Sequence, residues 1–279
     1  MSILQRRFWP RRLRLRKILR RLSGRERIGP VSELSTPLTH RAVLAAVKRA
    51  LGNELHGDHL DIGSGTGDLL RLFAANFPLR SLACDYTDGL MKVSGQKVEI
   101  VDLNRQPLPF GDNRFTLVTC IETIEHLENF RELVRETYRV LQPAGLAVFS
   151  TPNILNLRSR WRFLTSGFYS LFGPLALDEP KIHSTRGHIN PVSWFYLAHA
   201  LRGAGFENLR LSVDKYQRRS FLAFPLLALP IYLGDRIVRY RETDRYQTLD
   251  ERNIDIVRAM NSFDLLFGRT VIVTATKPR

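Results

Sequence analysis

The chain has only two cysteines among its 279 residues, Cys84 and Cys120, and both fall in apolar segments. This excludes a disulfide framework, and we expect two buried thiols of the kind found in a reducing compartment. No uninterrupted apolar run reaches the roughly 18 to 20 residues of a membrane-spanning helix, and the charged N-terminus lacks the apolar core of a signal peptide. His, Cys and Asp residues show no metal-ligand spacing, so the sequence predicts no metal.

Acidic residues are scarce at the two ends of the chain, which has a net charge of +15. Residues 1–29 contain eleven Lys or Arg and one acid, and residues 210–279 contain 13 Lys or Arg and 8 acids. Residues 30–209 are electrically neutral, with 18 of each. Phosphate binding scales with the number of cations placed against it, so a deep basic channel for nucleic acid is not expected in this central part.

Residues 1–29 form a basic N-terminal extension. Pro10 suits the first position of a helix and Gly24 suits its end. The apolar residues between them fall on one stripe: Leu15, Ile18, Leu19 and Leu22. A basic amphipathic helix of this kind predicts an anchor at a membrane surface. An RNA-binding arm and a disordered basic tail are the alternatives.

Three alternating glycines, Gly63, Gly65 and Gly67, follow a short apolar strand expected at residues 59–62. Glycine has no Cβ, so such a turn brings backbone N–H groups and the start of a helix close to a ligand. The third glycine of the dinucleotide fingerprint is missing, because Asp68 occupies its place. The pattern of this glycine turn (residues 63–67) still predicts a nucleotide cradle.

Acidic residues end the next two predicted strands, at residues 80–84 and 98–101. Asp85 follows the first of them, about two dozen residues beyond the glycine turn. A carboxylate at this place can accept hydrogen bonds from both hydroxyls of a ribose. The sequence therefore predicts that Asp85 binds a ribose, and Asp102 follows the other strand.

Three later segments read E-x-x-E-H at residues 122–126, R-x-L-Q-P-x-G at 139–145 and S-T-P-N at 150–153. With the glycine turn, they resemble the motifs of the class I S-adenosylmethionine-dependent methyltransferases, small-molecule subgroup. The resemblance covers residues of about 57–217 and 269–279. It implies an α/β, Rossmann-like fold, in which a seven-stranded sheet has helices on both faces and its last strand antiparallel.

The resemblance also implies S-adenosylmethionine as the methyl donor, with its methionine half on the glycine turn. Asp61 is then expected at the amino group and Asp102 at the adenine, with Leu103 against the ring. Glu122 lies where the methyl group emerges and is expected to contact cofactor or substrate. The implied cofactor-binding residues are Asp61, Gly63, Ser64, Gly65, Gly67, Asp85, Asp102, Leu103 and Glu122.

Residues 154–190 are aromatic at first and polar at their end, and we expect a substrate lid there, because open α/β sheets bind ligands beyond the carboxyl ends of their strands. His183 and His188 are candidates for a general base, since imidazole takes up a proton near neutral pH. His126 is a third catalytic candidate. A purely structural role is the alternative for each of the three.

About fifty residues separate the last two predicted strands, at 209–215 and 270–276. Residues 221–233 of this insertion are apolar and contain two prolines, which is too short and too broken for a membrane span. They either dip into one face of a membrane or form a buried helical hairpin. The predicted organisation is an extension at 1–29, a methyltransferase domain at 30–217 plus 269–279, and an apolar insertion at 218–268.

Together, these features predict O-methylation of a small or lipid-linked acceptor by a cytoplasmic protein held peripherally on the inner face of a membrane. A glycolipid, a polysaccharide precursor and a quinone-like molecule all fit as acceptors. An RNA methyltransferase that uses the basic arm is one alternative, with nucleic acid as its partner. A non-catalytic assembly factor with the same fold is the other, since fold does not fix function.

Overall fold

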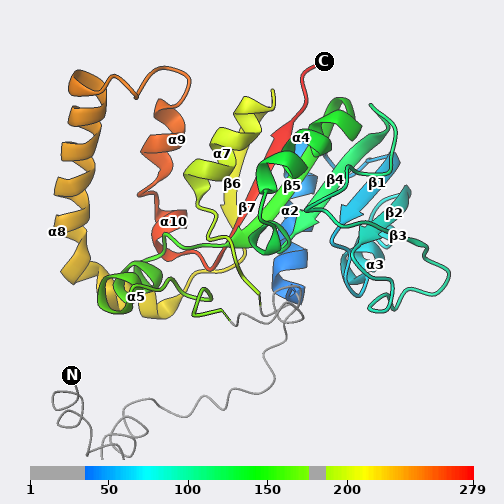
Figure 1. The fold of residues 1–279 in the computed structure, drawn as a ribbon, viewed down its shortest axis with the longest axis horizontal. Coiled ribbons are helices and arrows are strands. Elements are labelled where there is room, and N and C mark those ends of the chain that lie inside the picture. The colour runs from blue at the N-terminus through cyan, green and yellow to red at the C-terminus, as the bar shows by residue number, and fades with distance from the viewer. Residues whose placement is uncertain (1–34, 176–186) are drawn as a thin grey trace, which may run out of the picture. The chain divides into compact units, whose positions relative to one another are not determined.

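The computed structural model describes residues 35–175 and 187–279 (Figure 1). The part of the chain from Leu34 to Arg279 forms one compact unit. The predicted basic helix in residues 1–29 and the candidate base His183 lie outside the described residues.

Seven strands form one sheet in the order β3-β2-β1-β4-β5-β7-β6. Strand β7 is antiparallel to both of its neighbours, and the other neighbouring strands are parallel. The strands are β1 (Gly57–Ile62), β2 (Leu79–Asp85), β3 (Val98–Ile100), β4 (Phe115–Ile121), β5 (Leu141–Pro152), β6 (Glu207–Val213) and β7 (Thr270–Thr276). The predicted sheet, with its last strand antiparallel, is confirmed.

Helices cover both faces of this sheet, as predicted. Leu117 of β4 packs with Val43 of α2 and Phe73 of α3 on one face of the sheet. The next residue, Val118, points to the opposite face and belongs to the cluster that contains Leu133 of α4. Central strands of a parallel sheet are apolar on both faces for this reason. The helices are α2 (Pro37–Leu51), α3 (Asp68–Ala74), α4 (Phe130–Val140), α5 (Leu157–Ser166), α7 (Trp194–Gly203), α8 (Arg218–Tyr240), α9 (Ile254–Ala259) and α10 (Phe263–Phe267).

Helix α2 begins and ends at residues that favour helix termini. The Thr36 hydroxyl accepts a hydrogen bond from Thr39 N at 3.3 Å, Pro37 occupies the first turn, and Gly52 ends the helix with a φ of 83°. These are the preferred residues at a helix start and end. The helix packs on the sheet beside α3 and so helps to cover the glycine turn.

Strand β5 is 12 residues long. It begins at Leu141, directly after α4, and includes the Gln-Pro-Ala-Gly segment of residues 142–145. Its pairing with β4 shifts in register between Phe115 and Leu117. This irregularity lets the strand absorb the extra residues.

The insertion forms a long helix, so the expectation that the chain holds no segment long enough to span a membrane is wrong. Helix α8 continues through Pro225 and Pro230 into a π-helical turn, η2 (Arg241–Arg245). These 28 residues are long and apolar enough to cross a membrane, by length and composition alone. Ser220 is the one buried residue of α8, so a buried helical hairpin does not describe it.

One side of α8 packs on the rest of the unit, through Ala223, Leu227 and Ile231 against Leu157 of α5 and two residues of α10. Figure 1 shows α8 as the outermost helix of the unit, at the opposite end from β3.

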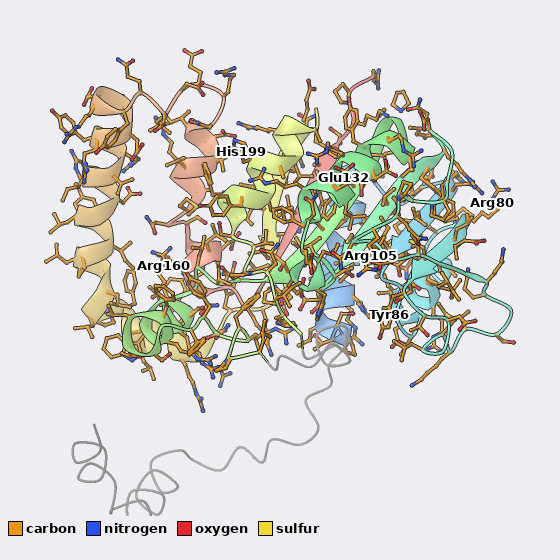
Figure 2. The ribbon with its side chains drawn as sticks, viewed as in Figure 1. Arg80, Tyr86, Arg105, Glu132, Arg160 and His199 are labelled. Atoms are coloured by element: carbon orange, nitrogen blue, oxygen red, sulfur yellow. The ribbon has the colours of Figure 1, made fainter. Side chains whose placement is uncertain are left out.

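Arg160 of α5, labelled in Figure 2, links the end of β5 to the insertion. It donates to Leu155 O at 2.6 Å, to Asn261 Oδ1 at 2.8 Å and to Met260 O at 3.0 Å. The insertion is therefore fixed to the carboxyl-end side of the sheet.

Candidate active site

The glycine turn between β1 and α3 has a backbone that only glycine accommodates well. Gly63 has a φ of 70°, and a Cβ there would lie 2.2 Å from Thr123 Oγ1. Gly67 has a φ of 75°, and a Cβ there would lie 2.6 Å from Met91 Sδ. Gly65 has a φ of 49°. Both the left-handed backbone and the close neighbours require the absence of side chains.

Asp85 holds the glycine turn against the end of β2. Its Oδ2 accepts from Gly65 N at 2.8 Å, and its Oδ1 accepts from Tyr86 N at 2.7 Å. Burial raises the pKa of Asp85, and the two amides oppose this effect. A carboxylate has about four lone-pair sites, so these bonds leave room for ribose hydroxyls. Tyr86, labelled in Figure 2, follows at the carboxyl edge of the sheet.

Asp61, at the end of β1, belongs to a buried polar chain. The Thr119 hydroxyl donates to Asp61 Oδ1 at 2.6 Å, and His59 Nε2 lies 2.8 Å from that hydroxyl oxygen. His59 Nδ1 lies 3.0 Å from Ser81 Oγ. Burial lowers the pKa of His59 to about 3 and keeps it neutral, and it raises the pKa of Asp61 to about 7. An ammonium group beside Asp61 would restore its charge.

The cleft at the glycine turn brings several predicted residues together with others that the sequence reasoning missed. Ser35 Oγ and His40 Nε2, which are 2.5 Å apart, face it from the start of α2. Burial lowers the pKa of His40. The lining residues are Ser35, His40, Asp61, Gly63, Ser64, Gly65, Thr66, Asp68, Leu69, Ile121 and Glu122.

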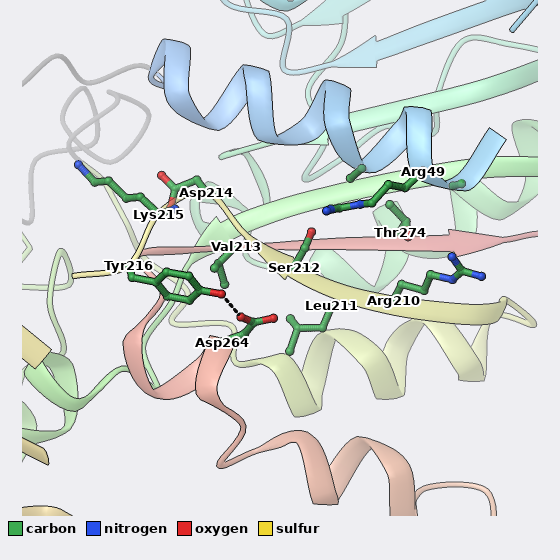
Figure 3. Close-up of a pocket in the computed structure, with 12 residues that line it drawn as sticks. Arg49, Arg210, Leu211, Ser212, Val213, Asp214, Lys215, Tyr216, Asp264 and Thr274 are labelled. Atoms are coloured by element: carbon green, nitrogen blue, oxygen red, sulfur yellow. Dashed lines mark hydrogen bonds between the residues drawn. The ribbon is translucent and has the colours of Figure 1, made fainter. Parts of the chain in front are cut away.

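A larger hollow, of about 470 Å³, lies between α2 and β6 (Figure 3). Its lining includes three cationic residues, Arg49, Arg210 and Lys215. It also includes Tyr216, whose hydroxyl donates to Asp264 Oδ1 at 2.6 Å. It shares no described residue with the glycine-turn cleft and contains no predicted site residue. We therefore place the active site at the glycine turn, where the predicted residues converge.

Asp102 and Leu103 follow β3 at the same edge of the sheet. The Asp102 side chain is 45% exposed, and its Oδ1 accepts from Asn104 N at 3.0 Å. Arg105 Nε, whose residue is labelled in Figure 2, lies 3.6 Å from Asp102 Oδ2. Asp102 is accessible to an adenine, and its role there stays a prediction.

Glu122 directly follows β4 and has a φ of 52°, a left-handed conformation that is unusual for a residue other than glycine. Its N–H lies 3.1 Å from both the carbonyl and the hydroxyl oxygen of Ser150, and that hydroxyl lies 3.3 Å from Glu122 Oε1. Burial raises the pKa of Glu122 to about 7, although Arg269 opposes this. Strain of this kind is often found at functional sites.

Glu125, His126 and His188 come together beyond β4, on the 3₁₀ turn η1 (Ile124–His126) and the segment after residue 186. His126 Nδ1 lies 3.0 Å from Gly187 O, and the two imidazole rings are 4.8 Å apart at 78°. Burial lowers the pKa of His126, and it lowers that of His188 to about 4. A base with so low a pKa has little driving force for taking up a proton, so a base role for His188 is weakened.

A family model described as a methyltransferase domain matches residues 38–211. The chain belongs to the class I S-adenosylmethionine-dependent methyltransferases. S-adenosylmethionine is the methyl donor of this family, so the predicted donor is confirmed at the level of the family.

Two similar relatives of this methyltransferase have quinone-related names. The ubiquinone/menaquinone biosynthesis C-methyltransferase UbiE of Klebsiella pneumoniae is 28% identical over 169 residues, which are 54% of this chain and 66% of that protein. The demethylmenaquinone methyltransferase of Listeria welshimeri is 33% identical over 168 residues, 54% of this chain and 70% of that protein. The chain thus spans about two thirds of the length of the curated relatives it matches.

A solved structure shows the same fold. The S-adenosylmethionine-dependent methyltransferase from Archaeoglobus fulgidus is 18% identical, with a TM-score of 0.52 over 85% of this chain and 94% of that one.

The residues of this methyltransferase fit its donor. The Ser64 hydroxyl is buried at the cleft and has no hydrogen-bond partner among the described residues. Asp85 has unused lone pairs, and Asp61 lines the cleft. A sulfonium donor with an amino group and a ribose would satisfy all three. The individual contacts to the donor remain predictions.

Proposed function

We propose that this methyltransferase methylates a hydroxyl oxygen of a lipophilic acceptor, of the quinol or lipid-linked class, at the cytoplasmic face of a membrane. The single observation that carries this proposal is an apolar face made by α5 and α8, beside the carboxyl ends of the strands. Its exposed residues are Trp161, Phe163, Leu164, Phe221, Leu222, Phe224, Leu226, Leu229, Tyr232 and Leu233. A concentration of exposed large apolar side chains on two packed helices is typical of a membrane or partner interface.

The position of the apolar face relative to the site supports this. Helix α5 begins at Leu157, shortly after β5 ends at Pro152, which is the edge of the sheet where α/β folds bind ligands. Helix α8 packs on α5. Helix α5, the part of this face that starts beside the carboxyl ends of the strands, would bring an acceptor held in a membrane toward the donor site.

Charge at the ends of α8 adds to the support. Arg218 begins the helix, and Arg236 lies near its end. Cations beside an apolar surface are attracted to anionic lipid headgroups. The basic residues 1–29 would act in the same way. The names of the two relatives refer to ubiquinone, menaquinone and demethylmenaquinone, which are themselves lipophilic.

The main contribution of the protein to methyl transfer is to align the donor with the acceptor. The acceptor oxygen attacks the methyl carbon in line with the carbon–sulfur bond, the new O–CH₃ bond forms, and the breaking bond leaves its electron pair on sulfur. The hydroxyl proton departs to solvent or to a base. Holding donor and acceptor in this geometry supplies much of the rate.

The acceptor class is tested by incubating cell extracts with the enzyme and methyl-labelled S-adenosylmethionine, followed by mass spectrometry of lipid, glycan, RNA and small-molecule fractions. We expect label in the lipid fraction, and NMR of the product decides between O-CH₃ and C-CH₃. Label in RNA that falls steeply with salt supports the RNA alternative instead. Calorimetry that finds no binding of S-adenosylmethionine supports the non-catalytic alternative.

Membrane contact is tested separately by sedimentation with vesicles of phosphatidylglycerol and phosphatidylcholine. We expect Leu222→Gln with Leu229→Gln to weaken binding severalfold, because both side chains are exposed on the apolar face. Tyr196→Gln on α7 is the matched control, since Tyr196 is also exposed but belongs to another helix. Removal of residues 1–29 should weaken binding further. Equal binding by all of these variants contradicts the membrane proposal.

A further inference from the structure

Three potential metal ligands from two distant parts of the chain converge shortly after Glu122, which lines the glycine-turn cleft. Glu125, His126 and His188 each offer one ligand atom, and these atoms all lie within 4.8 Å of one another. In a tetrahedral zinc site, with bonds of 2.0–2.2 Å, ligand atoms are roughly 3.4 Å apart. Small rotations of the side chains would be enough to close the cluster around an ion.

The polar groups of this cluster are buried without partners. Glu125 is fully buried, and neither of its carboxylate oxygens has a hydrogen-bond partner among the described residues. His188 Nδ1 is likewise buried and unpartnered within residues 35–175 and 187–279. Buried polar groups are nearly always satisfied, and an isolated buried carboxylate is costly. A bound cation would accept electron pairs from these atoms and satisfy them together.

Thr151 offers the simplest competing explanation. Its hydroxyl lies near enough to Glu125 to lower the pKa of that carboxyl, but the two groups do not meet at hydrogen-bond geometry, and both remain unpartnered in the described part of the chain. A protonated Glu125 that turned toward Thr151 would satisfy one oxygen. It would leave the second oxygen and His188 Nδ1 as they are.

The surrounding backbone holds the two histidines in position for an ion. His126 Nδ1–H donates to Gly187 O at 3.0 Å, which leaves Nε2 with a free lone pair. A backbone carbonyl on the remote nitrogen is the usual second contact of a metal-bound histidine. The amides of Ile189 and Asn190 both donate to Glu125 O, at 2.9 and 3.0 Å, so the segment that carries His188 is fixed to the 3₁₀ turn η1.

We propose that Glu125, His126 and His188 bind one divalent metal ion of the zinc type. Two imidazoles and one carboxylate suit a borderline ion such as Zn²⁺ better than Mg²⁺, which prefers oxygen ligands. Three protein ligands leave at least one position open, as in catalytic zinc sites. This differs from the sequence-based prediction of no metal, which nothing in the described residues tests.

The role of the ion, unlike the site itself, rests on the proposed function. An acceptor hydroxyl at the open position would have its pKa lowered, because the ion stabilises the oxyanion. The proton leaves to solvent, the oxygen forms the O–CH₃ bond, and sulfur keeps the electron pair of the bond that breaks. The ion thereby replaces the general base that His188 was predicted to supply.

The site is tested on untagged full-length protein, stripped with chelator and titrated with Zn²⁺ alone. We expect one ion per chain, and Co²⁺ substitution should give the visible absorption of a low-coordinate site. Glu125→Gln should weaken Zn²⁺ binding by more than about 100-fold, since changes in the outer shell alone cost 10- to 100-fold. If Glu125→Gln does not fold, His188→Gln, in the segment that follows residue 186, should weaken Zn²⁺ binding by the same factor. His199→Gln, an exposed histidine on α7 labelled in Figure 2, is the control and should bind normally.

Substoichiometric binding, or equal affinity in all three variants, means an adventitious ion only and overturns the site. The proposed function is tested separately, by measuring S-adenosylmethionine binding with calorimetry and by detecting the methylated product. Methyl transfer that continues in chelator, on a protein that binds Zn²⁺ stoichiometrically, overturns the role of the ion and leaves both the site and the methyltransferase activity standing.

Discussion

Backbone conformation fixes the glycine turn, whereas the cluster of Glu125, His126 and His188 is formed by side chains from two segments that lie far apart in the chain. In the turn, positive φ angles and close neighbours leave no freedom, and Asp85 fixes it through the Gly65 amide. In the cluster, buried oxygens and a ring nitrogen have no partners among the described residues.

This contrast matches the tasks of the two regions. A donor that is the same in every member of a family can be held by preformed backbone groups. An acceptor has to be met by groups whose hydrogen bonds are not already used. We therefore expect changes in the turn to abolish donor binding and changes on the acceptor side to alter activity while donor binding persists.

Gly63→Ala should have the largest effect. The added Cβ would lie 2.2 Å from Thr123 Oγ1 at a φ of 70°, so the turn has to move. We expect affinity for S-adenosylmethionine to fall by more than about 100-fold, measured by calorimetry, since backbone strain alone costs roughly 1–2 kcal/mol. Gly52→Ala is the control, because Gly52 also has a positive φ, of 83°, but no atom lies within 4 Å of its Cβ position. Equal loss in both variants would show that general destabilisation is responsible.

Asp85→Asn should have the next largest effect. The amide oxygen can still accept from Gly65 N, so the turn keeps this anchor. The amide nitrogen cannot accept from Tyr86 N, and the charge that favours ribose hydroxyls is lost. Hydrogen bonds to charged groups contribute about 1.5–3 kcal/mol, so donor affinity should fall by roughly 10- to 100-fold. Asp102→Asn, at an exposed carboxylate, should cost less than about tenfold. The reverse order would contradict the assignment of Asp85 to the ribose.

A change of pH should modulate donor binding more gently. The pKa of Asp61 is raised to about 7 by burial, so the native protein binds a proton there that the unfolded chain, with a pKa near 4, has already lost. The contribution of Asp61 to the free energy of unfolding therefore falls as the pH rises from about 4 to 7. An ammonium group prefers the ionised form, so donor affinity should rise about fivefold between pH 6 and pH 7.

Asp61→Asn tests this pH effect, because it removes the titrating group while keeping an acceptor for Thr119. Calorimetry at several pH values should then give a flatter profile. Glu122, whose pKa is also raised to about 7, is another group in the cleft that titrates in this range. A profile that stays steep in Asp61→Asn and flattens in Glu122→Gln would assign the effect to Glu122.

The sheet and the donor side follow from local sequence patterns. Three glycines at alternate positions after an apolar strand require a tight turn, and acids at strand ends fall at the ligand edge of any parallel sheet. The predicted strand at 270–276 agrees with β7 to the residue. Thr119 was missed because a threonine inside an apolar strand gives no sign of the carboxylate that it will face.

The acceptor side could not be predicted in the same way. His188 meets Glu125 and His126 only because backbone bonds from Ile189 and Asn190 fold its segment onto η1. No spacing along the chain encodes that approach. Helix α8 was underestimated because Pro225 and Pro230 were interpreted as breaks, although helix α8 continues through both of them. Packing on α5 and α10 outweighs the local preference.

The smallest expected effect concerns the two sides of α8. Leu222 is 82% exposed, so Leu222→Gln should change the free energy of unfolding by no more than about 0.5 kcal/mol. Leu227 lies five residues further along and packs with Leu157 and Phe267, so Leu227→Gln should cost about 1 kcal/mol or more. Urea denaturation without lipid measures both. If Leu222→Gln costs as much as Leu227→Gln, another surface covers the apolar face in solution, and a second copy of the chain becomes a better occupant of it than a membrane.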